Sequence, residues 1–567
     1  MTINKYIIIL AAAAFISSCS STQNIHKKTV PEGSTAAVNV PAKKGTLSQD
    51  ELNSWPHADI YKDSLPGMSL DRAYEFVADK KATTIVVGII DSGIDINHED
   101  LKDNVWTNSD EIAGNGKDDD NNGYIDDVHG WNFLGGDGTA TPEQLEVTRI
   151  YKKLNAKYGD KAESEIASDD MQEFAYYQKV KKDFDKRVVT ATRQFSEAEQ
   201  YNDQVSKLKA YLDNADEFTK AKLGKDIYTF EDLNTLSDED KNPLLMQIFA
   251  NGATVAEVKE QFDTEILISE EQMKHYGQQV KIMYNLDHDG RSVTGDNAYD
   301  ITDVPYGSAS VTGSIDDELH GTHVAGISLA TRNNRIGMNG VAENVKLLSV
   351  RAVPEGDEYD KDVALAIRYA VDNGAKVINM SFGKYYSPNA EWVYDAIKYA
   401  ASKDVLLVHA AGNDNKDIDK SDNFPTDAPD KVKEITDNVI TIGAMTRNYD
   451  EDLVASFSNY GKLNVDLFAP GLEIYSTVPK NEYKVLQGTS MAAPEVTGVA
   501  AMIRSYYPEL SASQVKHILM NSGIKVDFDV KLPGSEDLVP FSELSVSGRV
   551  LNAYNALKMA DSMVNGK

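Results

Sequence analysis

The chain of 567 residues contains a single cysteine, Cys19, so no disulfide can form within it. Basic residues are also in the minority. Lys and Arg number 57 against 89 Asp and Glu, which gives a formal net charge of −32. A polyanion of this size is repelled by phosphate backbones and by anionic lipid surfaces. Nucleic acid is therefore not an expected partner.

Apolar runs long enough to form a permanent membrane-spanning helix are missing as well. The longest candidate, residues 6–15, is short, follows Lys5 and ends shortly before Cys19. This pattern resembles a bacterial lipoprotein signal, which is cut before a cysteine that then carries lipid. The alternative is an ordinary secretory signal with an incidental cysteine. We expect a signal peptide over residues 1–18, lipidation of Cys19, and a place in the cell envelope with membrane attachment through this anchor only.

Composition divides the rest of the chain. Residues 19–50 are rich in Ser, Thr, Lys, Pro and Ala without apolar periodicity, which is typical of a solvated tether. Residues 143–281 are rich in Glu, Lys, Asp, Gln and Ala, with apolar residues three and four apart. That spacing predicts a helical insertion of amphipathic helices. A coiled-coil hairpin is possible there, although no long heptad repeat is visible. The flanking residues 51–142 and 282–567 should form one domain.

That domain has the pattern of an α/β fold with a doubly wound parallel sheet. Residues 83–90 (TTIVVGII) form a continuous β-branched run, as expected for a strand buried on both faces. Further short apolar strands alternate with helices after residue 320. Strands are predicted at 345–350, 377–380, 405–410 and 439–442, and helices at 70–77 (capped by Ser69), 361–372, 391–403, 513–522 and 549–559.

Four polar residues stand at strand ends or helix starts, where active sites of such sheets gather. Asp91 follows the first buried strand, where a carboxylate can orient an imidazole. His320 opens HGTHVAG ahead of a buried helix and can act as a general base. Ser490 of GTSMAAP begins another helix, whose dipole and backbone N–H favour negative charge. Asn413 ends VLLVHAAGN with an amide that can bind an oxyanion.

Each of these residues also has a purely structural interpretation. Asp and Asn often end strands, and Ser often caps a helix. His320 and His323 could share a metal ion, but no third ligand has matching spacing. His409 lies inside an apolar strand, and we expect it to be a core histidine with a satisfied hydrogen bond.

The motifs gain meaning as an ordered set: DSGID (91–95), HGTHVAG (320–326), NMSFG (379–383), AAGN (410–413) and GTSMAAP (488–494). The set resembles the subtilisin-like serine peptidases over about residues 55–140 and 285–560. The resemblance implies a calcium-using endopeptidase that acts on polypeptides. It implies that Asp91, His320 and Ser490 form a catalytic triad, with Asn413 as oxyanion donor. It further implies substrate-binding residues, which we take to be Ser381, Phe382, Gly383 and Gly412.

Two features depart from the family pattern. Asp91 and His320 are more than two hundred residues apart, whereas the family usually has a few dozen between them. The insertion must therefore enter and leave at neighbouring points if the triad is to close. In addition, only about 70 residues separate Cys19 from Asp91, which leaves no room for the usual folding prodomain.

An acidic segment resembles the start of a calcium loop. DDDNNGY (118–124) places oxygen ligands at alternating positions and a glycine sixth. We predict a structural calcium ion bound by Asp118, Asp120, Asn122 and Asp126, or by Asp127 in place of the last. The twelfth position is His129 instead of Glu, and a solvated acidic turn is the alternative. A second candidate with similar spacing consists of Asn285, Asp287, Asp289, Gly290 and Asp296.

Two other functions are compatible with the same residues. One is an acyl transferase that ligates or trims peptides during maturation. The other is a binding module that keeps a protease fold without cutting its partner. A binding module should carry a broken triad, and every candidate position is intact here.

Overall fold

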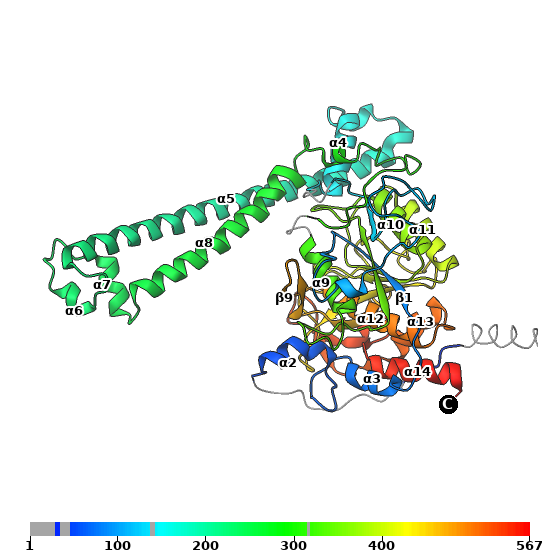
Figure 1. Ribbon diagram of the computed structural model, residues 1–567. Helices are drawn as coiled ribbons and strands as arrows, with labels where there is room; N and C mark the ends of the chain where they lie inside the picture. Colours follow the sequence, from blue (N-terminus) through cyan, green and yellow to red (C-terminus); the bar gives the residue numbers. More distant parts are fainter. Residues whose placement is uncertain (1–28, 34–45, 137–141, 314–317, 567) are drawn as a thin grey trace, which may run out of the picture. The chain divides into compact units, whose positions relative to one another are not determined.

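The computed structural model describes residues 29–33, 46–136, 142–313 and 318–566 (Figure 1). The predicted signal peptide, Cys19 and most of the predicted tether lie outside these ranges. Within them, no helix combines the length and the apolar character needed to cross a membrane. The chain divides into two compact units. Unit 1 consists of Met1–Pro142 and Gly290–Lys567, and unit 2 is Glu143–Asp289.

Unit 1 is built on a sheet with strand order β10-β13-β7-β6-β5-β4-β1-β3-β2. Neighbouring strands pair in parallel, except β10 and β13. This is the predicted doubly wound α/β sheet, and the central strands are buried over nearly all their residues. The strands are β1 (Ile85–Asp91), β2 (Gly130–Asn132), β3 (Val345–Arg351), β4 (Ala375–Met380), β5 (Leu406–Ala410), β6 (Val439–Met445), β7 (Leu467–Pro470), β10 (Ile524–Lys525) and β13 (Arg549–Val550).

Side chains of β1 enter two hydrophobic cores. Val87 and Ile89 belong to one cluster and Ile90 to the other, because successive side chains of a strand point to opposite faces. Helices α10 (Asp360–Asp372) and α11 (Ala390–Ser402) pack in the second cluster. The helices of the first cluster are α3 (Leu70–Val77), α9 (Glu318–Leu329), α12 (Thr489–Tyr506), α13 (Ala512–Ser522) and α14 (Ala553–Asn565).

The strand order reverses around β1. Strands β3 and β2 lie on one side of it, and β4 to β7 lie on the other. Such a reversal is a topological switch point, and α/β sheets bind ligands at its carboxyl-terminal edge. Ile90 of β1 pairs with Met380 of β4. Asp91 and Ser381, the next residue of each segment, therefore lie at this edge.

Two local predictions are wrong because tertiary contacts override the local signal. The predicted helix at 549–559 begins only at Ala553, and Arg549–Val550 instead pairs with β10 as strand β13. The hydroxyl of Ser69 caps no N–H of α3. This residue has a φ of 60°, and its Oγ accepts a hydrogen bond from Asn552 Nδ2 at 2.9 Å.

The segment before the sheet is part of the core. A capping box between Ser48 and Glu51 starts helix α2 (Gln49–Ser54). Trp55 follows, fully buried, and its indole N–H donates to the carbonyl of Glu473 at 3.3 Å. Short antiparallel pairs complete unit 1: β8 (Ile474–Val478) with β9 (Glu482–Leu486), and β11 (Asp529–Lys531) with β12 (Leu538–Pro540).

Unit 2 is helical, and its entry and exit segments touch. The backbone N–H of Leu145 donates to the carbonyl of Met283 at 3.1 Å, and Gln144 Nε2 donates to the carbonyl of Asn285 at 2.5 Å. These bonds explain why the unit extends to Asp289, past the predicted end at residue 281. Its α-helices are α4 (Glu146–Tyr158), α5 (Met171–Leu223), α6 (Phe230–Asn234), α7 (Pro243–Ala250) and α8 (Val255–Gln278).

Helices α5 and α8 lie side by side (Figure 1). Polar residues join them: Asn202 donates to Ser269 at 2.8 Å, and Lys259 donates to Asp216 at 2.7 Å. One seam of α5 is buried at every seventh residue, which is the period of a coiled coil. The repeat is hard to recognise in the sequence, because the seam contains alanines and a threonine and has polar residues beside it. The buried positions are Tyr177, Phe184, Ala191, Ala198, Val205, Leu212 and Thr219.

Candidate active site

Asp91 and His320 meet at the switch point of the sheet. The Oδ1 atom of Asp91 lies 2.7 Å from Nδ1 of His320, and it also accepts the backbone N–H of Ser92. The Asp91 side chain is 2% exposed and that of His320 is 38% exposed. A buried carboxylate thus fixes the imidazole of His320 with Nδ1 protonated, so Nε2 is left as the basic nitrogen.

A glycine makes this approach possible. A β-carbon at Gly321 would lie 2.2 Å from the carbonyl oxygen of Gly93 and 3.2 Å from the side chain of Asp91. Any larger residue would push α9 away from the loop that follows β1. The residue after His320 therefore has to be glycine for His320 to reach Asp91.

Burial and charge act in opposite directions on His320. Burial alone would lower the pKa of its imidazole, but the charge of Asp91 and the hydrogen bond to it raise that pKa above 6.5 overall. His323 differs, since burial lowers its pKa to about 3. Its Nε2 lies 3.1 Å from the carbonyls of both Ile474 and Lys484. Nε2 of His323 therefore donates within the core.

Ser490 stands in the first turn of α12, half-buried. Its hydroxyl donates to the carbonyl of Ser381 at 3.1 Å, and Ser381 Oγ donates back to the carbonyl of Ser490 at 2.9 Å. Ser490 is thereby tied to the end of β4, the strand beside Asp91. In the described part of the chain, His320 and Ser490 form no direct hydrogen bond. Catalytic contacts are often looser without substrate and tighten in the complex.

Asn413 presents its amide N–H₂ group beside the start of α12. Its Oδ1 accepts both the backbone N–H and the hydroxyl of Thr489, at 2.8 and 3.0 Å, which fixes the amide orientation. A β-carbon at Gly488 would lie 3.3 Å from Asn413 Nδ2 and 3.6 Å from the backbone nitrogen of Ser490. Neither of these N–H donors has an acceptor among the described residues. The two nitrogens thus lie close to one point beside Gly488, a placement that allows them to stabilise an oxyanion.

The residues predicted to bind substrate differ in what they offer. Gly383 is exposed, and no described residue hydrogen-bonds its backbone, so it offers an open edge for an extended peptide. The carbonyl of Phe382 is engaged with Nε2 of His409 at 3.0 Å, and His409 is the expected core histidine. Gly412 uses its N–H for Thr489 and its carbonyl for Asn459, so only its Cα face remains for contact.

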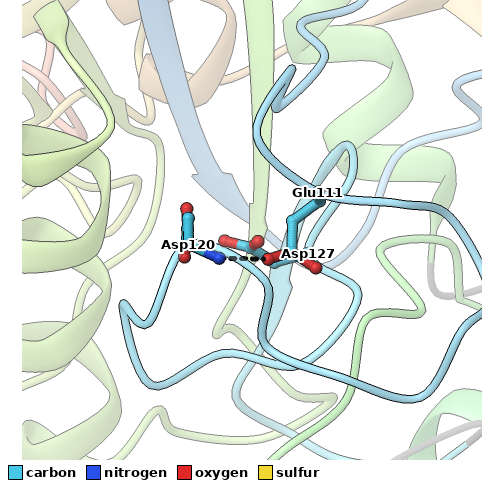
Figure 2. Close-up of side chains that lie close together, drawn as sticks. All are labelled: Glu111, Asp120 and Asp127. Atoms are coloured by element: carbon cyan, nitrogen blue, oxygen red, sulfur yellow. Dashed lines mark hydrogen bonds between the residues drawn. The ribbon is translucent and has the colours of Figure 1, made fainter.

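A group of carboxylates lies near the predicted calcium loop. Oxygens of Glu111, Asp120 and Asp127 all lie within 4.8 Å of one another, and the backbone N–H of Asp120 donates to Glu111 (Figure 2). Burial, together with the charge of Asp120, raises the pKa of Asp127 despite its hydrogen bonds to Tyr369 and Asn108. Glu111 was not among the predicted ligands, because it precedes the acidic loop in the sequence.

Among the residues predicted as calcium ligands, Asp120 and Asp127, the alternative to Asp126, are in this group, whereas Asp118, Asn122 and Asp126 are not. Asp118 binds the backbone N–H groups of Asn122 and Gly123, and Asp126 binds those of Asn115 and Gly116. Asn122 donates its side-chain amide to Asp120 and Asp127.

In the second predicted loop, Asp296 already has two protein cations as partners. It pairs with Arg291 at 2.8 Å and with the buried ammonium of Lys361 at 2.5 Å.

Comparison with known proteins decides the family. The model of the subtilase family (Peptidase_S8) matches residues 82–540. The chain belongs to the subtilase family. It is 40% identical over 220 residues to a thermophilic serine proteinase of Bacillus sp. (strain AK1), a match that covers 39% of this chain and 48% of that proteinase. Subtilisin DY of Bacillus licheniformis is 38% identical over 220 residues, which covers 38% of this chain and 75% of subtilisin DY.

A solved structure of proteases from Pseudoalteromonas arctica is 30% identical to this subtilase, with a TM-score of 0.35. The match covers 42% of this chain and 70% of that chain. This subtilase therefore spans about half the length of the first of these relatives and about three quarters of the second.

Proposed function

We propose that this subtilase hydrolyses peptide bonds with Ser490 as nucleophile, His320 as general base and Asp91 as the carboxylate that orients the base. The observation that carries the proposal is the 2.7 Å contact between Asp91 and His320 Nδ1. It lies at the sheet edge where the Ser490 hydroxyl touches the carbonyl of Ser381 at 3.1 Å. A base that is already oriented by Asp91 can accept the proton of the Ser490 hydroxyl once the two side chains meet in the substrate complex.

The cycle follows from these positions. Nε2 of His320 takes the proton of Ser490 as its oxygen attacks the scissile carbonyl, and the oxyanion is received by Asn413 Nδ2 and the N–H of Ser490. The imidazolium then gives its proton to the leaving amine. Water, deprotonated by the same base, attacks the acyl-enzyme, breaks the ester bond and releases the serine hydroxyl.

The substrates are polypeptides in extended form, aligned along the open backbone of Gly383. Main-chain pairing supplies affinity there, while side-chain contacts supply selectivity. An acyl transferase would use the same residues but would transfer the acyl group to an amine instead of water. Analysis of products from a denatured protein substrate separates the two, since only hydrolysis produces new carboxyl termini throughout.

The test of the proposed chemistry is labelling by a fluorophosphonate, which reacts with activated serines. The full chain should be labelled at Ser490, and Ser490→Ala should abolish labelling and lower turnover by about six orders of magnitude, the size known for subtilisin itself. A folded protein that reacts at no serine would overturn the proposal and would favour a binding module.

We also propose that Cys19 is lipidated and holds the enzyme at the cell envelope. The support is the sequence alone: one cysteine shortly after a short apolar segment. Cys19→Ala should move the protein from the membrane fraction to the soluble fraction. Retention of that variant in the membrane fraction would contradict the anchor.

A structural calcium ion is the third proposal. Hard oxygen donors are the ligands calcium takes, and Glu111, Asp120 and Asp127 provide three carboxylates at one point. A cation there would offset the cost of burying Asp127. Thermal unfolding should shift to lower temperature with chelator and recover with added calcium. The Glu111→Gln variant should show a smaller shift. Equal unfolding temperatures with and without chelator would reject the ion.

A further inference from the structure

Helix α5, 53 residues long, has a second row of apolar residues beside its buried seam (Figure 1). Tyr201, Leu208, Tyr211 and Phe218 are each between 42% and 50% exposed. Tyr201 and Leu208 are seven residues apart, and so are Tyr211 and Phe218. Apolar residues scattered singly on a surface need no explanation, whereas a row with the heptad period is typical of a helix that pairs with another helix.

The row fills three consecutive heptads. Its spacing alternates between three and four residues, as the a and d positions of a coiled coil do. Five of its six positions hold an apolar residue. We name this row the outer seam, and its members are Tyr201, Gln204, Leu208, Tyr211, Ala215 and Phe218.

Two aromatic rings of the outer seam are held in place by their hydroxyls. The hydroxyl of Tyr201 donates to Glu265 of α8 at 2.8 Å, and that of Tyr211 accepts from Nδ2 of Asn242 at 3.0 Å. Because both rings are fixed within unit 2, they lose little side-chain entropy when another helix covers them. The outer seam therefore presents an ordered surface.

Opposite charges stand at the two ends of the outer seam. Glu197 lies four residues before Tyr201, and Lys222 lies four residues after Phe218, so both continue the row. Glu197 pairs with Arg193 at 3.0 Å and Lys222 with Asp240 at 2.8 Å, and both pairs reach the solvent. Such exposed pairs are weak and can be exchanged for others at small cost.

The outer seam is complementary to its own reverse. When two copies of α5 lie antiparallel about the middle of the seam, an aromatic ring faces an aromatic ring at each end. Glu197 of one copy then faces Lys222 of the other. The facing pairs are Tyr201 with Phe218, Gln204 with Ala215, and Leu208 with Tyr211. A parallel alignment would instead bring like charges together at both ends, because each residue would meet itself.

We propose that the outer seam is a dimer interface, through which two copies of this chain pair by their α5 helices in antiparallel orientation. A two-fold axis then passes between Leu208 and Tyr211, and the same patch serves on both copies. A second copy is the occupant because the order of sizes and charges along the seam matches its own reverse. The inference goes beyond the proposed peptidase chemistry and does not depend on it.

Disulfide cross-linking tests the orientation. Cys19 is the single cysteine, so the full chain with Cys19→Ala has no thiol. Glu197→Cys and Lys222→Cys are introduced separately into it. A mixture of the two variants should form a disulfide-linked dimer on mild oxidation. Each variant alone should stay largely unlinked, because its two copies of the same position would be 25 residues apart, about 37 Å along the helix axis.

Sedimentation equilibrium of the full chain with Cys19→Ala measures the association itself. Leu208→Glu places a charge near the two-fold axis on both copies and should raise the dimer dissociation constant about tenfold or more. Tyr211→Glu, at the facing position, should do the same and replaces Leu208→Glu if that variant fails to fold. Val189→Glu is the matched control. Val189 is an exposed apolar residue of the same helix outside the outer seam, so this change should leave the dissociation constant unchanged.

Three results would overturn the interface. They are a chain that stays monomeric at every concentration and forms no cross-link, a dimer that withstands both Leu208→Glu and Tyr211→Glu, and a single-cysteine variant that links efficiently to itself, which indicates parallel pairing. Fluorophosphonate labelling of Ser490 reports separately on the proposed chemistry. It should be equal in Leu208→Glu and in the parent chain.

Discussion

At the residue scale, the chemistry depends on a few groups whose environment decides their charge. The motifs indicated Asp91, His320, Ser490 and Asn413 because each residue type can supply one part of acyl-transfer chemistry at a strand end or a helix start. They could not reveal Glu111, because it precedes the acidic loop in the sequence and lies beside Asp120 and Asp127 only in the folded chain.

Asp91→Asn tests how the carboxylate governs His320. The charge of Asp91 raises the pKa of His320, so activity should fall as pH drops through that raised pKa. Without the charge, burial dominates and the pKa falls, so the acid limb of the kcat/KM profile should move to lower pH. The maximum rate should drop by about four orders of magnitude, because the imidazole loses its correct tautomer. A profile of kcat/KM against pH checks both, with the exposed Asp203→Asn as control.

Glu495 is a buried carboxyl that the proposed mechanism leaves unused. It is 1% exposed, its Oε2 has no partner among the described residues, and burial raises its pKa well above the usual value. A folded-state pKa above the unfolded one gives stability that is present at low pH and lost as pH rises through the folded pKa. The Glu495→Gln substitution replaces the carboxyl by a neutral amide, so the variant does not lose this stability as pH rises.

The free energy of unfolding of Glu495→Gln, measured with urea, should therefore exceed that of wild type by a margin that grows from pH 5 to pH 9. The exposed Glu482→Gln provides the comparison and should show a constant difference. A margin for Glu495→Gln that stays flat across this range would contradict a neutral, buried Glu495.

At the element scale, strands and short helices were predictable wherever a local pattern of residues was sufficient to determine the secondary structure. Continuous apolar runs predicted β1, β4 and β5, because a strand that is buried on both faces needs apolar residues at successive positions. The length of α5 was not predictable, since small and polar residues in its seam look exposed in sequence. Their burial depends on α8, which lies far away along the chain.

The polar contacts between α5 and α8 should contribute to the stability of unit 2. Asp216 is 2% exposed, and although burial would raise its pKa, Lys259, Lys220 and Tyr228 lower it overall. This stabilisation is present at neutral pH and is lost as pH falls through the lowered pKa. Lys259→Ala removes one partner and should cost about 1–2 kcal/mol of unfolding free energy.

Urea unfolding monitored by hydrogen exchange in α8 would measure that loss. Lys207→Ala serves as the matched control, because its pair with Asp203 is 75% and 61% exposed and should be worth less than about 0.5 kcal/mol. Equal losses of unfolding free energy in the two variants would contradict a larger contribution from the buried pair.

At the scale of the whole molecule, unit 2 interrupts the family fold without interrupting its sheet. The sequence indicated that the insertion must return to its starting point, since the strands before and after it belong to one sheet. The hydrogen bond of Leu145 to Met283 shows where it does so. The distance between these two backbones is small enough for a short glycine linker.

Replacing residues 146–282 by such a linker should leave unit 1 folded and reactive. The expected result is fluorophosphonate labelling at Ser490 with a rate near that of the full chain, read out beside thermal unfolding. Digestion of a folded protein and of a short peptide should then be compared. A changed ratio of the two rates would assign unit 2 a part in substrate access, whereas loss of folding would show that unit 1 depends on it.

The buried Trp55 bears on maturation. Its indole N–H donates to the carbonyl of Glu473, the residue before β8. The carbonyl of Met68 accepts the backbone N–H of Ala553, the first residue of α14. The amino-terminal helices and the last helix therefore belong to the same hydrophobic core. Processing of the amino terminus that leaves a working enzyme must therefore stop upstream of Ser48. A cut beyond Trp55 would remove the buried Trp55 side chain from the first core.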